Sequence, residues 1–192
     1  MAYTDILWGA QIVSPGTNLT PVDISRFRYS GDGATTWVKG QLCVLSSGVI
    51  AGVTRQGDGI EQASDLAVGK YFIGLEAQAA TTTGKVPVQR ITPDTIFEGF
   101  LVQSSTDSLP TAPESIIDSE YALFIDSNQR LAVDKDTTSS PSVRIVDVES
   151  RFHPILAPSW QKLHYADHDS DGTPESRYPL VRFKILSTVV EA

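Results

Sequence analysis

The stretch of this chain with the most chemically versatile side chains is HYADHDSDGTPESRY, residues 164–178. Three aspartates stand at alternate positions and Gly172 follows them, which is the opening half of an EF-hand calcium loop. In such a loop a backbone carbonyl and a later carboxylate supply further oxygens. The candidate metal ligands are therefore Asp167, Asp169, Asp171, Thr173 and Glu175.

The second half of the calcium motif is missing from this loop. Counting from Asp167, the twelfth position holds Tyr178 where an EF-hand has a bidentate glutamate. Pro174 removes a backbone donor, and no helical pattern flanks the loop. We therefore expect a solvated acidic loop and no cofactor, with a partial Ca²⁺ site as the alternative.

The sequence contains no motif for nucleotide binding, nucleophilic catalysis or a thiolate zinc site. The Gly84-Lys85 pair lacks the residues that a phosphate-binding loop needs on either side, and there is no G-x-S-x-G nucleophile motif. A single cysteine, Cys43, excludes an intrachain disulfide and a thiolate zinc site. We expect a protein that is not an enzyme.

Composition narrows the class of partners. The chain has 192 residues, of which 41% are hydrophobic and 20% charged, as in ordinary globular domains. Its net charge is −8, without a basic stripe, so we expect no nucleic acid partner. No apolar run approaches the roughly 20 residues of a membrane span, and the N-terminus lacks a basic signal-peptide region. We expect no membrane partner and synthesis in a cytoplasm.

The elements that would position any site are strands. Short apolar segments with period-2 alternation recur, separated by Gly, Ser, Asn and Asp turns, and no long segment shows a helical period. This predicts an all-β fold, a small barrel or sandwich. We expect strands within 35–45, 48–53, 69–79, 84–91, 94–103, 120–126, 130–135, 142–148 and 178–190. Pro87 cannot donate to a ladder, which predicts an edge strand there.

Two regions lack this pattern. Residues 1–35 hold Pro15, Gly16 and Pro21, and predict an extended N-terminal arm that precedes a barrel domain of residues 36–192. Residues 104–119 are polar with two prolines, and predict a long connection with a short helical turn at 113–117.

One segment resembles a known family. Residues 37–102 are similar to the strand and turn pattern of tailed-phage capsid decoration, or cement, proteins, which are small β-barrel head proteins. The similarity lies in these motifs: Lys39-Gly40, Ser47-Gly48, Ile73-Gly74-Leu75-Glu76, Val86-Pro87-Val88 and the Asp94–Glu98 segment. The terminal acidic turn and LVRFKILST are also similar to the last strand of such proteins.

The resemblance implies a structural virion protein on the outer surface of a capsid. Its partners would be the major capsid protein and itself, as a homotrimer or alternatively a dimer. The apolar arm and an exposed tryptophan would contact the capsid, through Ile6, Leu7, Trp8, Ile12, Val13 and Trp160. The competing hypothesis, based on the acidic loop, is a calcium-dependent β-sandwich that binds carbohydrates or surfaces.

Overall fold

The computed structural model describes residues 10–14, 24–29, 38–53, 60–64, 66–75, 85–103, 110, 112–126, 129–148, 165–166, 176–177 and 179–191. Within these ranges the chain is almost entirely β-strand, which confirms the all-β prediction. One 3₁₀ turn, η1 (Glu114–Ile116), lies in the expected long connection. None of the helical segments in these ranges has the length and hydropathy of a membrane span.

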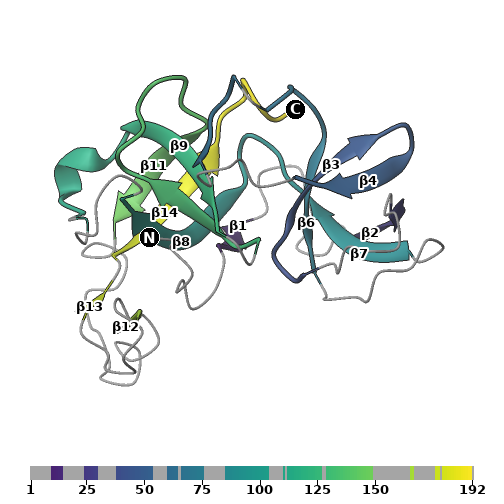
Figure 1. The fold of residues 1–192 in the computed structure, drawn as a ribbon, viewed down its shortest axis with the longest axis horizontal. Coiled ribbons are helices and arrows are strands. Elements are labelled where there is room, and N and C mark those ends of the chain that lie inside the picture. Colours follow the sequence, from purple (N-terminus) through teal and green to yellow (C-terminus); the bar gives the residue numbers. More distant parts are fainter. Residues whose placement is uncertain are drawn as a thin grey trace.

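The first half of the chain forms a closed barrel, on the right of Figure 1. Its strands are β2 (Ile24–Tyr29), β3 (Leu42–Ser46), β4 (Val49–Gly52), β6 (Tyr71–Gly74) and β7 (Lys85–Arg90). They follow one another around the barrel in the order β2-β4-β3-β6-β7. The two-residue turn Ser47-Gly48 joins β3 to β4, and both residues have positive φ, as a tight hairpin of this hand requires.

The second half forms a seven-stranded sheet that also returns on itself. Its main strands are β8 (Ile96–Val102), β9 (Glu120–Ile125), β10 (Leu131–Asp134), β11 (Val143–Val148) and β14 (Leu180–Ile185). They run in the order β8-β10-β9-β11-β14, and β14 pairs again with β8. We call these five strands the second ring. Two short strands, β1 (Gln11–Ser14) and β5 (Ile60–Glu61), join its edges, and β12 (Tyr165–Ala166) pairs with β13 (Ser176–Arg177) separately.

The barrel and the second ring have the same topology. Replacing β2, β3, β4, β6 and β7 by β8, β9, β10, β11 and β14 turns one strand order into the other. The first and third strands are parallel in both, and all other neighbours are antiparallel. The register also agrees. In each repeat, residues that pair across the second, fourth and fifth strands form a row, which we call the outer rung, and the two rows occupy equivalent positions. This rung is Leu42, Ile73 and Gln89 in the barrel, and Glu120, Arg144 and Lys184 in the second ring.

Backbone hydrogen bonds outside the strands repeat as well. The N–H of Gly40 donates to the carbonyl of Gly74 (2.8 Å), and the N–H of the counterpart Asp118 donates to that of Ile145 (2.9 Å). Gly40 and Asp118 both have positive φ, 82° and 66°. Agreement in topology, register and turn geometry makes the two halves structural repeats of one unit, although few equivalent residues are identical.

The interiors of the two repeats are filled from equivalent positions. Cys43, Ile50, Phe72 and Val88 form the barrel's core cluster, with Leu45 packed against it. Their counterparts all lie in the larger cluster of the second ring, and are Tyr121, Val133, Val143, Phe183 and Leu123. Burial raises the pKa of the Cys43 thiol well above its usual value, so this thiol stays protonated and unreactive in the barrel.

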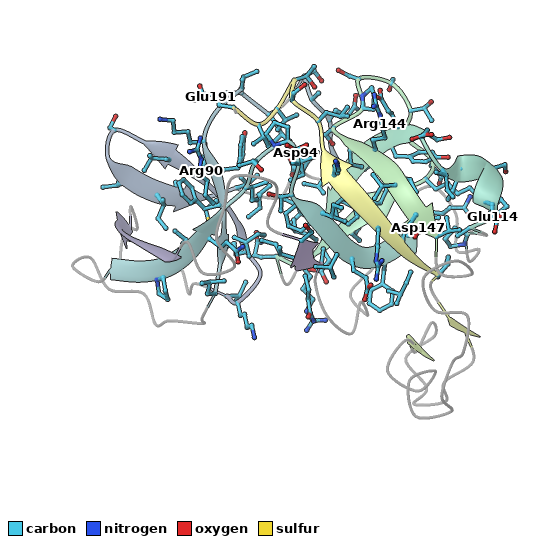
Figure 2. The ribbon with its side chains drawn as sticks, turned by 180° about the vertical axis from the view of Figure 1, so that it is seen from behind. Arg90, Asp94, Glu114, Arg144, Asp147 and Glu191 are labelled. Atoms are coloured by element: carbon cyan, nitrogen blue, oxygen red, sulfur yellow. The ribbon has the colours of Figure 1, made fainter. Side chains whose placement is uncertain are left out.

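The outer rung of the two repeats differs. In the barrel, Leu42 and Ile73 are buried and belong to the second ring's apolar cluster. This face of the barrel therefore packs against the second ring, and we call the contact the junction. In the second ring, Glu120 and Arg144 form an ion pair in which both side chains are substantially exposed. Figure 2 shows Arg144 on the ring, away from the junction.

Three crossing segments fasten the two repeats together. β1 pairs with β8, although the chain next enters the barrel, and β5 leaves the barrel to pair with β9. The C-terminal segment returns, with the N–H of Gly69 donating to the carbonyl of Val189 (3.0 Å) and that of Glu191 to Gly69 (3.0 Å). These exchanges make the two repeats one cooperative body.

Two expectations need correction. Residues 24–29 of the expected arm are the barrel strand β2, and β1 of the same arm belongs to the second ring's sheet. Pro87 is not on an edge, because β7 lies between β2 and β6. A residue's nitrogen and oxygen point to the same side of a strand, and the Pro87 oxygen accepts from Leu75, just past the end of β6. The Pro87 nitrogen, which has no hydrogen to donate, therefore faces the residues just past the end of β6, where no ladder hydrogen bond has to be formed.

Candidate functional site

The junction between the barrel and β1 contains a pocket of about 370 Å³. This volume lies at the lower end of the range of ligand pockets. Its lining comes from β1, from the barrel and from the turn between β9 and β10. The lining residues are Ala10, Gln11, Ile12, Lys39, Gly40, Ile73, Gly74, Leu75, Gln89 and Arg130.

The described lining of this pocket contains two cationic residues. Among the lining residues that the structure describes, Lys39 and Arg130 are the ionisable ones, whereas the whole chain carries −8. Lys39 is exposed, and Arg130 is half-buried. The turn that carries Arg130 is held because its N–H donates to the Oδ1 of Asp126 (2.7 Å). The pocket therefore presents two cations, two glutamine amides and an apolar wall from Ile12, Ile73 and Leu75.

Glycines open the pocket and let β1 reach it. A Cβ on Gly40 would have no atom within 4 Å, so the space beside Lys39 is open. A Cβ on Gly99 of β8 would lie 2.9 Å from the Cβ of Ala10, closer than real contacts. Glycine at position 99 thus allows Ala10 to lie against β8, and the N–H of Ala10 donates to the carbonyl of Leu131 (3.0 Å).

β1 lines this pocket and, in the described part of the chain, has one strand neighbour. Among the residues that the structure describes, its single strand neighbour is β8. Its register shifts between Ile12 and Ser14, which leaves Val13 in a bulge with 46% of its surface exposed. An exposed edge can accept a strand from a partner, and a bulge restricts how long that added strand can be.

The structure brings two of the predicted contact residues to this site. Ile12 lines the pocket and Val13 is exposed beside it. The other predicted contact residues (Ile6, Leu7, Trp8 and Trp160) lie outside the described residues. So do the predicted metal ligands (Asp167, Asp169, Asp171, Thr173 and Glu175). Across the described ranges, no group of His, Cys, Asp and Glu side chains could hold a metal ion.

Sequence reasoning missed the cationic residues of the pocket. Lys39-Gly40 was noticed only as the entry to a strand, and Arg130 only as the start of another. Lys39 and Arg130 are 91 positions apart in the sequence, so no local pattern joins them. No protein family, curated protein or solved structure matches this chain.

Proposed function

We propose that this chain is a capsid decoration protein, which binds the outer surface of a tailed-phage head and stabilises contacts between major capsid subunits. One observation carries the proposal. The described residues of the family-like motifs, from Lys39-Gly40 to Glu98, lie on β6, β7 and β8 or in the turns and short connections beside barrel strands and β8, and Glu76 lies outside the described residues. The resemblance thus concerns the strands and turns of a folded unit, which is a stronger basis than composition.

The architecture suits a bridging role. Closed rings of strands leave few open edges, so copies displayed at high density would not aggregate by pairing edge to edge. The two repeats are fastened together by crossing segments, and we propose that they contact two neighbouring subunits. Because a ligand that binds only the assembled shell stabilises that state, many copies would raise the stability of the head. We propose a homotrimer, with a dimer as the alternative, because several linked contacts add avidity.

The direct test is binding to purified heads that lack decoration. The full chain should sediment with such heads and raise the temperature at which they release their DNA. A variant without residues 1–9 should bind weakly yet keep its melting temperature. The deletion stops at residue 9 because Ala10 is buried and bonded to Leu131. If the full chain stays in the supernatant at micromolar concentrations, the proposed function is wrong.

The alternative calcium module gives a different result in the same preparation. A protein that needs Ca²⁺ should lose several degrees of melting temperature in EDTA and regain them with added Ca²⁺. A decoration protein with a solvated acidic loop should show the same melting temperature in both buffers. The measurement is a thermal melt of the isolated chain, so it needs no capsid.

A further inference from the structure

We infer that β1 is an exchangeable strand, which can leave the β8 of its own chain and pair with the β8 of a second copy of this chain. The inference deepens the proposed function, since it rests on the proposed self-association and names the contact that would join the copies. Three features carry it: the fit between β1 and its site, the closure of both rings by other strands, and the identity of the contacts made within and between chains.

The site that holds β1 fits this particular segment. Ala10 is buried and lies against Gly99 of β8, where a Cβ on the glycine would come within 2.9 Å of the Ala10 Cβ, so small residues suit both positions. Two residues later, Ile12 packs against the apolar cluster of the second ring. The N–H of Ala10 also donates to the carbonyl of Leu131 (3.0 Å). The matching occupant is an extended segment with a small residue and then an apolar one, and a second copy of this chain carries that segment.

Both rings are closed by other strands, so β1 can leave without opening either of them. The second ring closes because β8 pairs with both β10 and β14, and the barrel closes through the pairing of β2 with β7. β1 is a four-residue strand beside β8, and Val13 in its bulge has 46% of its surface exposed (Figure 1). A short strand with a partly exposed side chain opens more easily than the rings, because local opening requires less free energy than global unfolding.

The same contacts form whether β1 comes from the same chain or from a second copy. Exchange of an identical element is therefore a low-cost route to oligomers, because no new interface has to be built. Residues 15–23 link β1 to β2, and a linker of this length gives the strand of the same chain an effective concentration in the millimolar range. Exchange becomes favourable where copies are held at a similar local concentration, as on a densely decorated shell.

The exchange also accounts for both proposed oligomers. β1 and the face of β8 that receives it are different surfaces, so each copy donates at one place and accepts at another. Between two copies the exchange is reciprocal, and around three copies it closes a ring. The proposed homotrimer and the alternative dimer therefore arise from one and the same contact.

The test is disulfide trapping in the isolated chain, without phage heads. Gln11 of β1 pairs with Glu98 of β8, and Arg182 of β14 pairs with the same Glu98 from the other side. Paired residues of antiparallel strands have Cα atoms about 4.5–5.5 Å apart, within the range that a disulfide spans. The test variant is Gln11→Cys with Glu98→Cys, and its matched control is Arg182→Cys with Glu98→Cys. The native Cys43 is buried, so it stays out of the reaction.

Each variant is equilibrated at protein concentrations from about 10 µM to about 1 mM, oxidised, and separated on a non-reducing denaturing gel. In the control both cysteines belong to one ring, so the disulfide should form within one chain at every concentration. In the test variant the share of covalent dimers and trimers should rise with concentration and exceed that of the control by about tenfold at about 1 mM. Equal shares in the two variants, or a test variant that stays monomeric at the highest concentration, overturn the inference.

A mixing experiment replaces the double variant if it fails to fold, as judged by its melting temperature. Chains with Gln11→Cys alone are mixed with isotope-labelled chains that carry Glu98→Cys alone, and the mixed disulfide is measured by mass spectrometry. In the control mixture, chains with Arg182→Cys replace those with Gln11→Cys. More mixed disulfide in the first mixture than in the control supports exchange. Equal amounts mean chance collision between chains, and the inference is wrong.

The result is distinguishable from that of the head-binding test. A chain that sediments with heads but gives no trapped oligomers keeps the proposed function and rejects the exchange. A chain that gives trapped oligomers but stays in the supernatant keeps the exchange and rejects the proposed function.

Discussion

The barrel and the second ring are one architecture with two different outer faces. Both have the same strand order, register and entry turn, and both are filled from equivalent inward positions. Their outer rungs differ: Leu42 and Ile73 are buried in the junction, whereas Glu120 and Arg144 are paired and exposed. Side chains that point into each ring are apolar in both repeats. Side chains on the outer rung are apolar where the repeats pack together and charged where the face is partly exposed.

This comparison shows why the two repeats have different outer faces. A repeated unit with an apolar outer face would continue to stack on further copies. In the second ring the equivalent face carries a charged ladder of Glu120, Arg144 and Lys184, which is stable in water. The two repeats therefore share one apolar interface, and the equivalent face of the second ring, which we call the terminal face, is charged and partly exposed, as in capping repeats.

The largest expected loss of stability comes from truncating Phe183 of β14, and its equivalent in β7 is Val88. Phe183 is fully buried and stacks on Phe97, with ring centroids 5.4 Å apart. Phe183→Ala should lower the free energy of unfolding by about 3–5 kcal/mol, and Val88→Ala, which removes fewer carbons, by about 2 kcal/mol. Urea unfolding measures both. A larger loss for Val88→Ala would contradict the view that the second ring holds the main core.

The next effect probes the outer rung. Ile73→Arg copies the second ring's Arg144 onto the junction face, where it places a charge in an apolar cluster. It should cost about 2–4 kcal/mol, and the conservative rung variant Gln89→Lys, which copies Lys184, should cost under about 1 kcal/mol. Urea unfolding should show one transition in each case. If Ile73→Arg is as mild as Gln89→Lys, the junction face is not sealed.

The attachment of β1 to the second ring is tested by a pair of variants. Gly99→Ala would bring a Cβ to 2.9 Å from that of Ala10 and should cost about 1–3 kcal/mol through overpacking. Ala10→Gly removes the nearest atom that this Cβ would meet, while Ala10 Cα (3.2 Å) and Phe183 Cε1 (3.3 Å) remain, so the double variant should recover part of the loss. Additive losses in a double-mutant cycle would show that β1 is not held at this contact.

Much of the strand architecture could be predicted from local sequence. The sequence predicts a hairpin turn at residues 46–48 and a helical turn at 113–117, and both have local causes; the structure has the turn at Ser47-Gly48, with Ser46 in β3, and the helical turn at Glu114–Ile116. The repeat itself could not be predicted, because equivalent residues such as Leu42 and Glu120 differ in polarity. Its signal lies in hydrogen-bond register, which a sequence does not display.

The arm and the pocket show the limits more sharply. Pro15, Gly16 and Pro21 suggest an arm, but the strand β2 that follows is identified only by its partners β4 and β7. A short strand gains stability from pairing that is non-local, so its own residues carry a weak pattern. The pocket likewise depends on bringing Lys39 to Arg130, and only the fold determines that approach.

A smaller effect is the pH dependence of stability that the barrel core gains from its buried thiol. Burial raises the pKa of the Cys43 thiol in the folded state, so its neutral form is favoured there. Below the unfolded pKa of about 8.5 this stabilisation is fully present, and it is lost as pH rises through that value towards the folded pKa. We expect the native chain to lose about 1–2 kcal/mol between pH 8 and pH 10 through this thiol. Its counterpart in the second ring, Tyr121, leaves no equivalent thiol there.

The control for this pH effect is Cys43→Ala, measured by urea unfolding at each pH. The variant is less stable at pH 8 because it leaves a small cavity, but its loss between pH 8 and pH 10 should be smaller than that of the native chain. Parallel pH profiles for the two proteins would show that other groups, such as the buried Tyr71, account for the whole change.

The smallest effect tests whether the terminal face is solvated. Glu120 and Arg144 are partly exposed, so their coupling energy in a double-mutant cycle with alanine should be below about 0.5 kcal/mol, and lower still in 1 M salt. The same cycle performed on a complex with a partner would separate two uses of this face. A coupling that rises above about 1 kcal/mol in the complex means that the partner covers the charged ladder. An unchanged coupling means that the partner binds elsewhere, and leaves the terminal face as the solvated end of the repeat.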